Sequence, residues 1–270
     1  MKELEFSTSF LEILGLSSQP PSVAYLSELA QHHLDVVAYE NLSKLDRFAK
    51  GQLTLPTPEE YLHDLRFNGL GGTCFTINSF FCQLLRALGF EADLIGGLSH
   101  EGKRSHLSLR VKIESIFYAL DLGYMLPNPG PFSLDGPEIS MPSGARVYKV
   151  SPLSDRLFRI ELRRGDVIGR SFESSLEKQT LADFANSIRG SFGSSELFMK
   201  TLCVHRRFKD HFRTVWGNEY IKCNGTKFEM RHIANRDDLA QILKCDLGVT
   251  DFRIEHALAV IATNLGSELL

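Results

Sequence analysis

Apolar residues recur at helical spacing in the first third of the chain. After Pro21 the pattern runs through Leu26, Leu29, Ala30, His33 and Leu34. Steps of three and four residues place such positions on one face of a helix. The sequence therefore predicts a helix that begins shortly after Pro21.

A second helix is predicted from its start signal. Thr57-Pro58-Glu59-Glu60 combines a capping threonine, a proline at the first helical position and an acid at the third. This helix is expected to end near Asn68-Gly69, since glycine is favoured just beyond a helix end.

A third helix is predicted over residues 74–88. One face of it would carry the apolar residues Ile77, Phe80, Phe81, Leu84, Leu85 and Leu88. Gly89 follows at the position of a C-terminal cap. The first ninety residues are therefore expected to be mainly helical.

From residue 91 to about residue 172 the pattern changes to that of strands. Between residues 106 and 113 polar and apolar side chains alternate, from His106 and Leu107 to Lys112 and Ile113. Residues 117–122 are predicted to form the return strand. A further hairpin is expected from 157 to 172, with its turn at Arg164-Gly165-Asp166. Short antiparallel strands of this kind favour a small barrel or sandwich.

A loop rich in proline and glycine separates these hairpins. It begins at Gly123 and reaches Pro131, and half of the chain's ten prolines fall between residues 127 and 142. Such a composition excludes regular structure, and long ordered loops inside compact proteins are often functional. The loop directly follows the strand that carries Asp121, which favours a functional loop over a domain linker.

The last eighty residues mix strands with helices. A strand is predicted over 197–204, followed by hairpin-like segments at 212–230. One helix is expected to start at Asn235, with Asp238 at its third position, and another to run from Ile254 to Leu265.

Composition excludes several classes of function. The 270 residues are 43% hydrophobic and 23% charged, with a net charge of −3 at pH 7, as in an ordinary soluble globular protein. The chain has no long run of one charge, so its sequence does not indicate a nucleic-acid partner. No apolar stretch is long enough to span a bilayer, and Met-Lys-Glu-Leu-Glu at the N-terminus lacks the pattern of a signal peptide.

The cysteines also favour a cytoplasmic protein. There are five, and none forms a C-x-x-C pair: Cys74, Cys82, Cys203, Cys223 and Cys245. An odd number of widely spread thiols suits a reducing compartment, where they stay free. The histidines other than His106, which is considered below, show no metal-ligand spacing with carboxylates or thiols, so we expect no metal site.

Cys74 is the strongest candidate for chemistry. It follows Gly71-Gly72-Thr73 at the predicted start of a helix. The two glycines allow a sharp backbone turn and leave the following amides unshielded. Unpaired N–H groups and the positive end of the helix dipole favour the thiolate, which is the nucleophilic form of a cysteine.

His106 and Asp121 lie on the two predicted strands of one hairpin. If a two-residue turn centres on 113–114, His106 stands directly opposite Asp121. If it centres on 114–115, Asp121 faces Ser108 and His106 is its diagonal neighbour on the same face. In both registers the imidazole and the carboxylate share a face, as a Cys-His-Asp triad requires.

Each of these three residues also has a structural interpretation. A buried cysteine is most often a small hydrophobic residue. His106 begins the polar face of a strand, where a solvated histidine is common. Asp121 precedes Leu122-Gly123 and could serve as a turn acid. Cys82, two turns further along the predicted helix, is interpreted as a core residue.

Together these segments resemble the arylamine N-acetyltransferase family. The matching runs are His32-His33-Leu34, Tyr39-Glu40-Asn41-Leu42, Gly71-Gly72-Thr73-Cys74-Phe75 with Asn78, His106-Leu107-Ser108-Leu109 and Leu120-Asp121-Leu122-Gly123. A weaker match runs from Ala185-Asn186 through Leu202 to Arg206-Arg207. Their order and spacing span nearly the whole chain, and the length fits the bacterial members.

The resemblance implies an α+β fold with a cysteine-peptidase-like arrangement of Cys, His and Asp. It implies a helical bundle at 1–90 that carries the nucleophile, an antiparallel β-barrel at 91–190 that carries His and Asp, and an α/β lid at 191–270.

The resemblance also implies a function: transfer of an acetyl group from acetyl-CoA to an arylamine or hydrazine, by a ping-pong route through an acyl-cysteine. Cys74 would be the nucleophile, His106 the base and acid, and Asp121 the orienting carboxylate. Acetyl-CoA would be a co-substrate, and no permanently bound cofactor is implied. Gly123, Tyr124, Met125 and Pro127 would border the coenzyme A cleft.

The sequence departs from the family pattern at three places. Leu70 and Thr76 replace an arginine and a glutamate that normally brace the nucleophile loop, so no unmatched charge remains from that pair. The run Gly123-Tyr124-Met125 lacks the family's second glycine.

Other functions remain open at the level of sequence. The family includes amide synthases that acylate from a carrier-bound polyketide. Transglutaminase-like enzymes and cysteine peptidases also place Cys on a helix and His and Asp on strands. A non-catalytic relative that binds a ligand in the same cleft is a further alternative.

Overall fold

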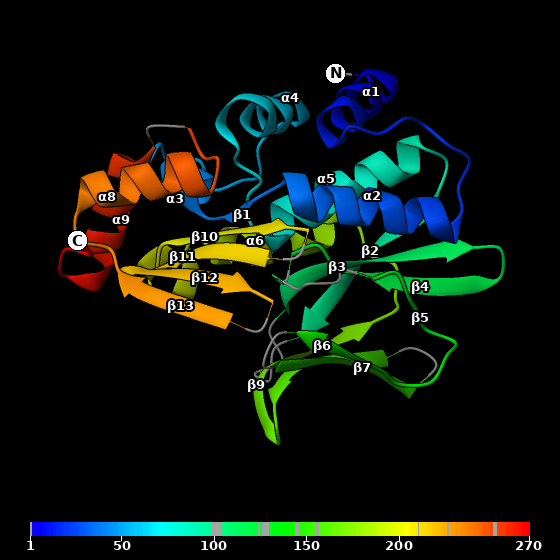
Figure 1. Ribbon diagram of the computed structural model, residues 1–270. Helices are drawn as coiled ribbons and strands as arrows, with labels where there is room; N and C mark the ends of the chain where they lie inside the picture. The colour runs from blue at the N-terminus through cyan, green and yellow to red at the C-terminus, as the bar shows by residue number, and fades with distance from the viewer. Residues whose placement is uncertain are drawn as a thin grey trace. The chain divides into compact units, whose positions relative to one another are not determined.

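The computed structural model describes residues 2–98, 104–123, 125, 130–143, 146–154, 157–209, 211–225, 227–250 and 253–270. Helices and antiparallel sheets both contribute, so the predicted α+β class is confirmed (Figure 1). The chain divides into two compact units. Unit 1 comprises residues 1–33 and 77–187, and unit 2 comprises residues 34–76 and 188–270. The boundaries expected for a helical domain, a barrel and a lid stay a prediction.

Unit 1 contains helices with aromatic inner faces. Helix α1 (Glu3–Leu14) precedes α2 (Val23–Val36), and α5 (Cys74–Ala87) enters the unit at residue 77. The ring of the buried His33 lies 6.0 Å from that of Phe10 and 5.2 Å from that of Phe81. Burial lowers the pKa of His33 to about 3, so this histidine is a neutral core residue.

An eight-stranded antiparallel sheet forms the rest of unit 1, in the order β5-β4-β3-β2-β9-β8-β7-β6. Its strands are β2 (Glu91–Leu98), β3 (Arg104–Ile113), β4 (Ile116–Leu120), β5 (Phe132–Ser133), β6 (Ile139–Ser143), β7 (Arg146–Ser154), β8 (Leu157–Arg164) and β9 (Val167–Ser175). The hairpin predicted from 157 to 172 is confirmed as β8 and β9, with Gly165 in the left-handed conformation at its turn.

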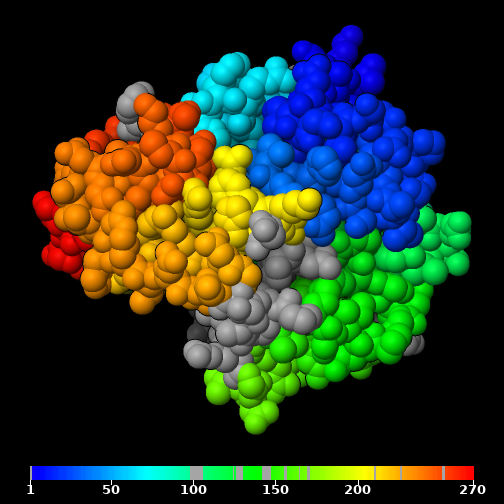
Figure 2. All heavy atoms as spheres, in the orientation of Figure 1, coloured from blue at the N-terminus to red at the C-terminus, as the bar shows by residue number. Residues whose placement is uncertain are grey.

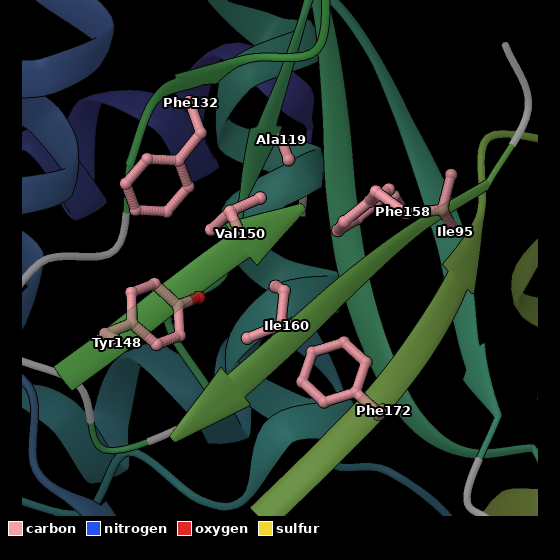
Figure 3. Packing of buried hydrophobic residues seen from close by; sticks show 8 residues of the cluster. All are labelled: Ile95, Ala119, Phe132, Tyr148, Val150, Phe158, Ile160 and Phe172. Carbon is pink, nitrogen blue, oxygen red and sulfur yellow. The ribbon is translucent and has the colours of Figure 1, made fainter. Parts of the chain in front are cut away.

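This sheet curls into a nearly closed barrel. The ring of Phe132, on the edge strand β5, lies 5.7 Å from the ring of Tyr148 on β7, which neighbours the opposite edge strand. Side chains from β2, β4, β5, β7, β8 and β9 meet in one buried cluster (Figure 3). Strands from both edges can contribute to one core only if the sheet curves back on itself.

The β3–β4 hairpin has the second of the two registers considered above. Ile113 pairs with Ile116 and Leu109 pairs with Leu120, so the turn consists of Glu114 and Ser115. Glu114 has φ 55°, a left-handed conformation that suits the tight turns of hairpins. The register places Asp121 one step beyond Leu120, on the same face as Ser108 and His106.

Unit 2 contains the remaining helices. Near the N-terminus of this unit lie α3 (Leu42–Ala49) and α4 (Pro58–His63), and α4 continues as a π-helical turn (Asp64–Asn68) that ends at Gly69. The capping box at Thr57 and the end at Gly69 are as predicted. Asn235 caps α8 (Arg236–Gln241) through the Asp238 amide. A π-helical turn (Ile242–Asp246) and α9 (Ile254–Leu265) follow.

Ion pairs attach α9 to the first helices of unit 2. Arg253 donates to both carboxylate oxygens of Asp64, at 2.9 and 2.7 Å. His256 Nδ1 lies 2.8 Å from the buried carboxylate of Asp46, on α3. In the described part of the chain, no helix is both long and apolar enough to cross a membrane.

A five-stranded antiparallel sheet completes unit 2, in the order β1-β10-β11-β12-β13. Its strands are β1 (Tyr39–Glu40), β10 (Cys203–Phe208), β11 (His211–Trp216), β12 (Glu219–Asn224) and β13 (Lys227–His232). The hairpins predicted at 212–230 are therefore confirmed. All of β13 is exposed, and the orange region that includes it lies on the surface in Figure 2.

The strand predicted over 197–204 was wrong in its first half. Residues Leu197–Lys200 form one helical turn, α7, and the strand begins only at Cys203. The cause is a buried side chain distant in sequence. Asn41 Nδ2 donates to the carbonyls of Phe198 and Thr201 at 2.7 Å each, and Asn41 Oδ1 accepts from Cys203 N at 2.8 Å. These bonds hold the carbonyls in a helical turn that the apolar pattern does not reveal.

Two short helical segments connect the β-rich part of unit 1 to unit 2. They are a 3₁₀ turn (Leu181–Phe184) and α6 (Ala185–Gly190). A second capping box, at Thr180, starts the first of them. Phe184, in the first of these segments, is fully buried.

The substitution Asn41→Ala is expected to lower the free energy of unfolding by about 3 kcal/mol, because three buried backbone groups lose their partner. Urea denaturation measures this loss. The control is Asn235→Ala, which removes one exposed helix cap and should cost about 1 kcal/mol. Equal losses in the two variants would contradict the role assigned to Asn41.

Candidate active site

Cys74 is the first residue of α5. Gly72, two residues before Cys74, has φ 88°, a conformation that residues with side chains rarely adopt. A Cβ on Gly71 would lie 2.2 Å from the carbonyl oxygen of Ala38, so the backbone approach there admits only glycine. The two glycines thus fix the turn that places the thiol at the helix start, as the sequence predicts.

A buried carboxylate holds this loop from the side. Glu40 is fully buried, and its Oε1 accepts from Gly72 N at 2.6 Å. Ser43 donates to the same carboxylate through its backbone N–H at 2.9 Å and its hydroxyl at 2.6 Å. The Glu40 N–H donates in return to the Gly72 carbonyl at 3.1 Å. The loop before Cys74 is therefore fixed by two reciprocal hydrogen bonds to Glu40.

Burial raises the pKa of Glu40 from its ordinary value, and the three donated hydrogen bonds oppose that shift. In the part of the chain that the structure describes, no lysine or arginine pairs with this carboxylate. Leu70 is buried as an apolar residue, and Thr76 packs against Gly72. The loop is thus held by Glu40 and by packing rather than by an ion pair.

His106 and Asp121 form a buried pair within unit 1. His106 Nε2 lies 2.6 Å from Asp121 Oδ2. Because a carboxylate only accepts, the imidazole donates from Nε2, and Nδ1 becomes the nitrogen that can take up a proton. The side chain of Asp121 is 1% exposed and that of His106 10% exposed, so water competes little for this bond.

The Asp121 carboxylate is itself fixed by further donors. Its Oδ1 accepts from Gly123 N at 2.9 Å and from Asn78 Nδ2 at 3.2 Å. Asn78 Nδ2 also donates to the Leu107 carbonyl at 2.5 Å, and its Oδ1 accepts from Leu122 N at 3.1 Å. Asn78 thus ties α5 to both strands of the hairpin, one helical turn after Cys74.

An aromatic ring covers the imidazole. The Phe172 ring centroid lies 4.6 Å from that of His106. Gly97 makes this packing possible, because a Cβ there would lie 2.8 Å from the Phe172 ring and 3.2 Å from the His106 Cβ. The sequence did not reveal the roles of Phe172 and Gly97. Asn78 was named only through the family resemblance.

The structure therefore brings together two of the three predicted catalytic residues, His106 and Asp121, inside unit 1. Cys74 belongs to unit 2 and begins the helix that carries Asn78. Of the predicted coenzyme contacts, Gly123 donates to Asp121, and Met125 has φ 53°. Tyr124 and Pro127 lie outside the described residues.

Among the described residues, no group of three or more His, Cys, Asp and Glu side chains is arranged to hold a metal ion. All five cysteines are free thiols.

Comparison with known proteins gives one family. A family model described as N-acetyltransferase matches residues 22–253. An uncharacterized acetyltransferase, YvcN, from Bacillus subtilis is 22% identical over 205 residues, which cover 73% of this chain and 76% of the relative.

Solved structures show the same fold. The arylamine N-acetyltransferase from Salmonella typhimurium superposes with a TM-score of 0.81 at 19% identity, covering 96% of this chain and 98% of the other. The Mycobacterium marinum arylamine N-acetyltransferase in complex with CoA has a TM-score of 0.78 at 17% identity, covering 95% and 98%.

The substitution Gly71→Ala is expected to lower the free energy of unfolding by at least about 2 kcal/mol, since its methyl group would overlap the Ala38 carbonyl. Urea denaturation gives the measurement. In the matched control Gly190→Ala, the added Cβ meets nothing within 4 Å, and stability should change by less than about 0.5 kcal/mol. A Gly71→Ala variant as stable as the control would contradict the close approach.

Proposed function

Because the chain belongs to the N-acetyltransferase family, which includes the arylamine N-acetyltransferases that its sequence resembles, we propose that it transfers an acetyl group from acetyl-CoA to the nitrogen of an arylamine or hydrazine. The observation that supports this most is the buried His106–Asp121 hydrogen bond, anchored through Asn78 to the helix that begins with Cys74. In this proposal the three residues form one Cys-His-Asp triad.

Each triad member has one task. Cys74 is the nucleophile, and its position at a helix start favours the thiolate. His106 holds the thiol proton as an imidazolium through Nδ1. Asp121 fixes the ring tautomer and stabilises the imidazolium without itself taking the proton.

The first half-reaction loads the enzyme. The Cys74 sulfur attacks the thioester carbonyl carbon of acetyl-CoA, and the bond from that carbon to the coenzyme sulfur breaks. The departing coenzyme A thiolate takes the proton from the His106 imidazolium. An acetyl thioester on Cys74, a neutral imidazole and free CoA result.

The second half-reaction passes the acetyl group on. The acceptor nitrogen attacks the acyl carbon, His106 takes the proton that this nitrogen loses, and the bond from carbon to the Cys74 sulfur breaks. The products are the N-acetyl compound and the original thiolate–imidazolium pair. Because neither half-reaction requires a metal or a redox step, no permanently bound cofactor is proposed.

Coenzyme A is proposed to bind along the segment after Asp121, bordered by Gly123, Tyr124, Met125 and Pro127. The solved CoA complex of the Mycobacterium marinum relative supports acetyl-CoA as the donor. We further propose that the enzyme works in the reducing cytoplasm, which would keep the free Cys74 thiol usable.

The central test is intact-mass spectrometry after mixing the protein with acetyl-CoA. One acetyl group is expected on Cys74, and it should be lost again when aniline or phenylhydrazine is added, with N-acetyl product formed. The Cys74→Ser variant should take up no acetyl group, since a serine hydroxyl is far less acidic than a thiol.

Cys82→Ser is the matched control for this test. Burial raises the pKa of Cys82 to about 12, so this thiol is not expected to react. The variant should acetylate as the parent protein does. Absence of any adduct on Cys74, with no CoA released in the presence of an amine, would exclude acetyl transfer. Hydrolysis of a peptide amide without CoA would favour the peptidase-like alternative.

The substitution Asp121→Asn is expected to lower kcat/KM by about 10³-fold or more, because the amide no longer selects the His106 tautomer. Acetyl transfer to aniline provides the assay, and circular dichroism checks the fold. The control is Asp166→Asn at the exposed turn between β8 and β9, which should leave the rate unchanged. A rate for Asp121→Asn within tenfold of the parent would contradict the assignment.

A further inference from the structure

Lys44 is a buried cation close to the nucleophile loop within unit 2. It lies on α3 and is 9% exposed. Its Nζ donates to Ser191 Oγ at 2.7 Å and lies 4.8 Å from the centroid of the Phe192 ring. Among the described residues, no carboxylate lies within ion-pair distance of this ammonium. Burial lowers the pKa of Lys44 to about 8.

A thiolate at Cys74 would raise the pKa of Lys44. It favours the protonated lysine, and Glu196 does so to a smaller extent. Lys44 and both chain neighbours of Cys74, Thr73 and Phe75, line the same cavity of about 30 Å³. A cavity of this volume has room for about one water molecule. Lys44 therefore lies beside the loop that carries the Cys74 thiol.

The other charged groups around this cavity are already paired. Arg47 donates to the Thr54 carbonyl at 2.9 Å and to Glu60 at 3.2 Å. Asp64 accepts from Arg253 through both oxygens. Glu40, which lies outside the cavity lining, accepts hydrogen bonds from Gly72 and Ser43. None of these groups neutralises Lys44.

We infer that Lys44 is a positioning residue that stabilises the Cys74 thiolate and so activates the nucleophile. The inference rests on the proposed function, in which Cys74 attacks the acyl donor. A buried ammonium without a counter-charge is unfavourable, and a thiolate nearby offsets that cost. The same attraction stabilises the thiolate. His106 supplies the proton acceptor, whereas Lys44 supplies only a fixed positive charge.

The pH dependence of the Lys44 contribution to Cys74 reactivity follows from the protonation of the lysine. Below about pH 8 Lys44 is mainly the ammonium and supports the thiolate. Above that pH Lys44 loses its charge and no longer supports the thiolate. The contribution of Lys44 should therefore be large in mildly acidic solution and absent in alkaline solution.

The experiment measures the rate at which iodoacetamide alkylates Cys74, followed by mass spectrometry of the Cys74 peptide, between pH 5.5 and pH 10. These pH values lie about two to two and a half units either side of the pKa of Lys44. In Lys44→Met the rate at about pH 6 should fall about tenfold, the change expected when a thiol titrates about one pH unit higher. At about pH 10 the two rates should coincide.

Lys50→Met is the matched control. Lys50 lies just after α3, is half exposed and pairs with Asp46. Its removal should leave the whole alkylation profile unchanged. Ser191→Ala gives a second variant that keeps the lysine but removes its hydrogen-bond acceptor, and it should shift the profile in the same direction by a smaller amount.

Two results would overturn the inference. One is a Lys44→Met profile that coincides with that of the parent, or, if that variant does not fold, an unchanged Ser191→Ala profile. The other is a rate lowered equally at every pH, which indicates a change in access to the thiol. Formation of the acetyl adduct on Cys74 is measured in a separate experiment. If no adduct forms, the proposed acetyl transfer is wrong, but the alkylation profiles still test the role of Lys44.

Discussion

The buried hydrogen bond between His106 and Asp121 is the interaction on which the proposed chemistry depends. A carboxylate removed from water is unfavourable unless charged or polar donors surround it, and here the donors are the imidazole, the Asn78 amide and the Gly123 N–H. Because these hydrogen bonds fix the position of the carboxylate, they also fix the orientation and the tautomer of the imidazole that donates to it. The barrel, through Gly97 and Phe172, holds the ring from the other side.

Two adjacent residues perform a similar task in unit 2. Glu40 fixes the backbone before Cys74, and Asn41 fixes the helical turn α7 and the start of β10. Both are fully buried and fully hydrogen-bonded. Satisfied polar groups of this kind specify one backbone conformation more strictly than apolar packing does. The loop before Cys74, the proposed nucleophile, thus depends on a polar network, and Lys44 is the positive charge proposed to act beside it.

Much of this arrangement could be predicted from the sequence, because local signals determine it. The capping residues at Thr57 and Asn235, the apolar face after Cys74 and the alternation in β3 all depend on residues close in the chain.

Other features could not be predicted. The sequence did not decide between two positions for the β3–β4 turn, since both keep His106 and Asp121 on one face. Glu114 decides it by adopting a left-handed conformation that a glutamate does not signal. The helical turn at Leu197 was missed because its cause, Asn41, lies 157 residues from Phe198. Lys44 was missed because a lysine in a helical pattern is usually exposed.

The most direct measurement is a crystal structure of the protein after exposure to acetyl-CoA. The account predicts an acetyl thioester on Cys74, with His106 Nδ1 within about 4 Å of the sulfur and Nε2 still bonded to Asp121. An unmodified Cys74 sulfur, or an imidazole whose Nδ1 faces away from it, would contradict the account.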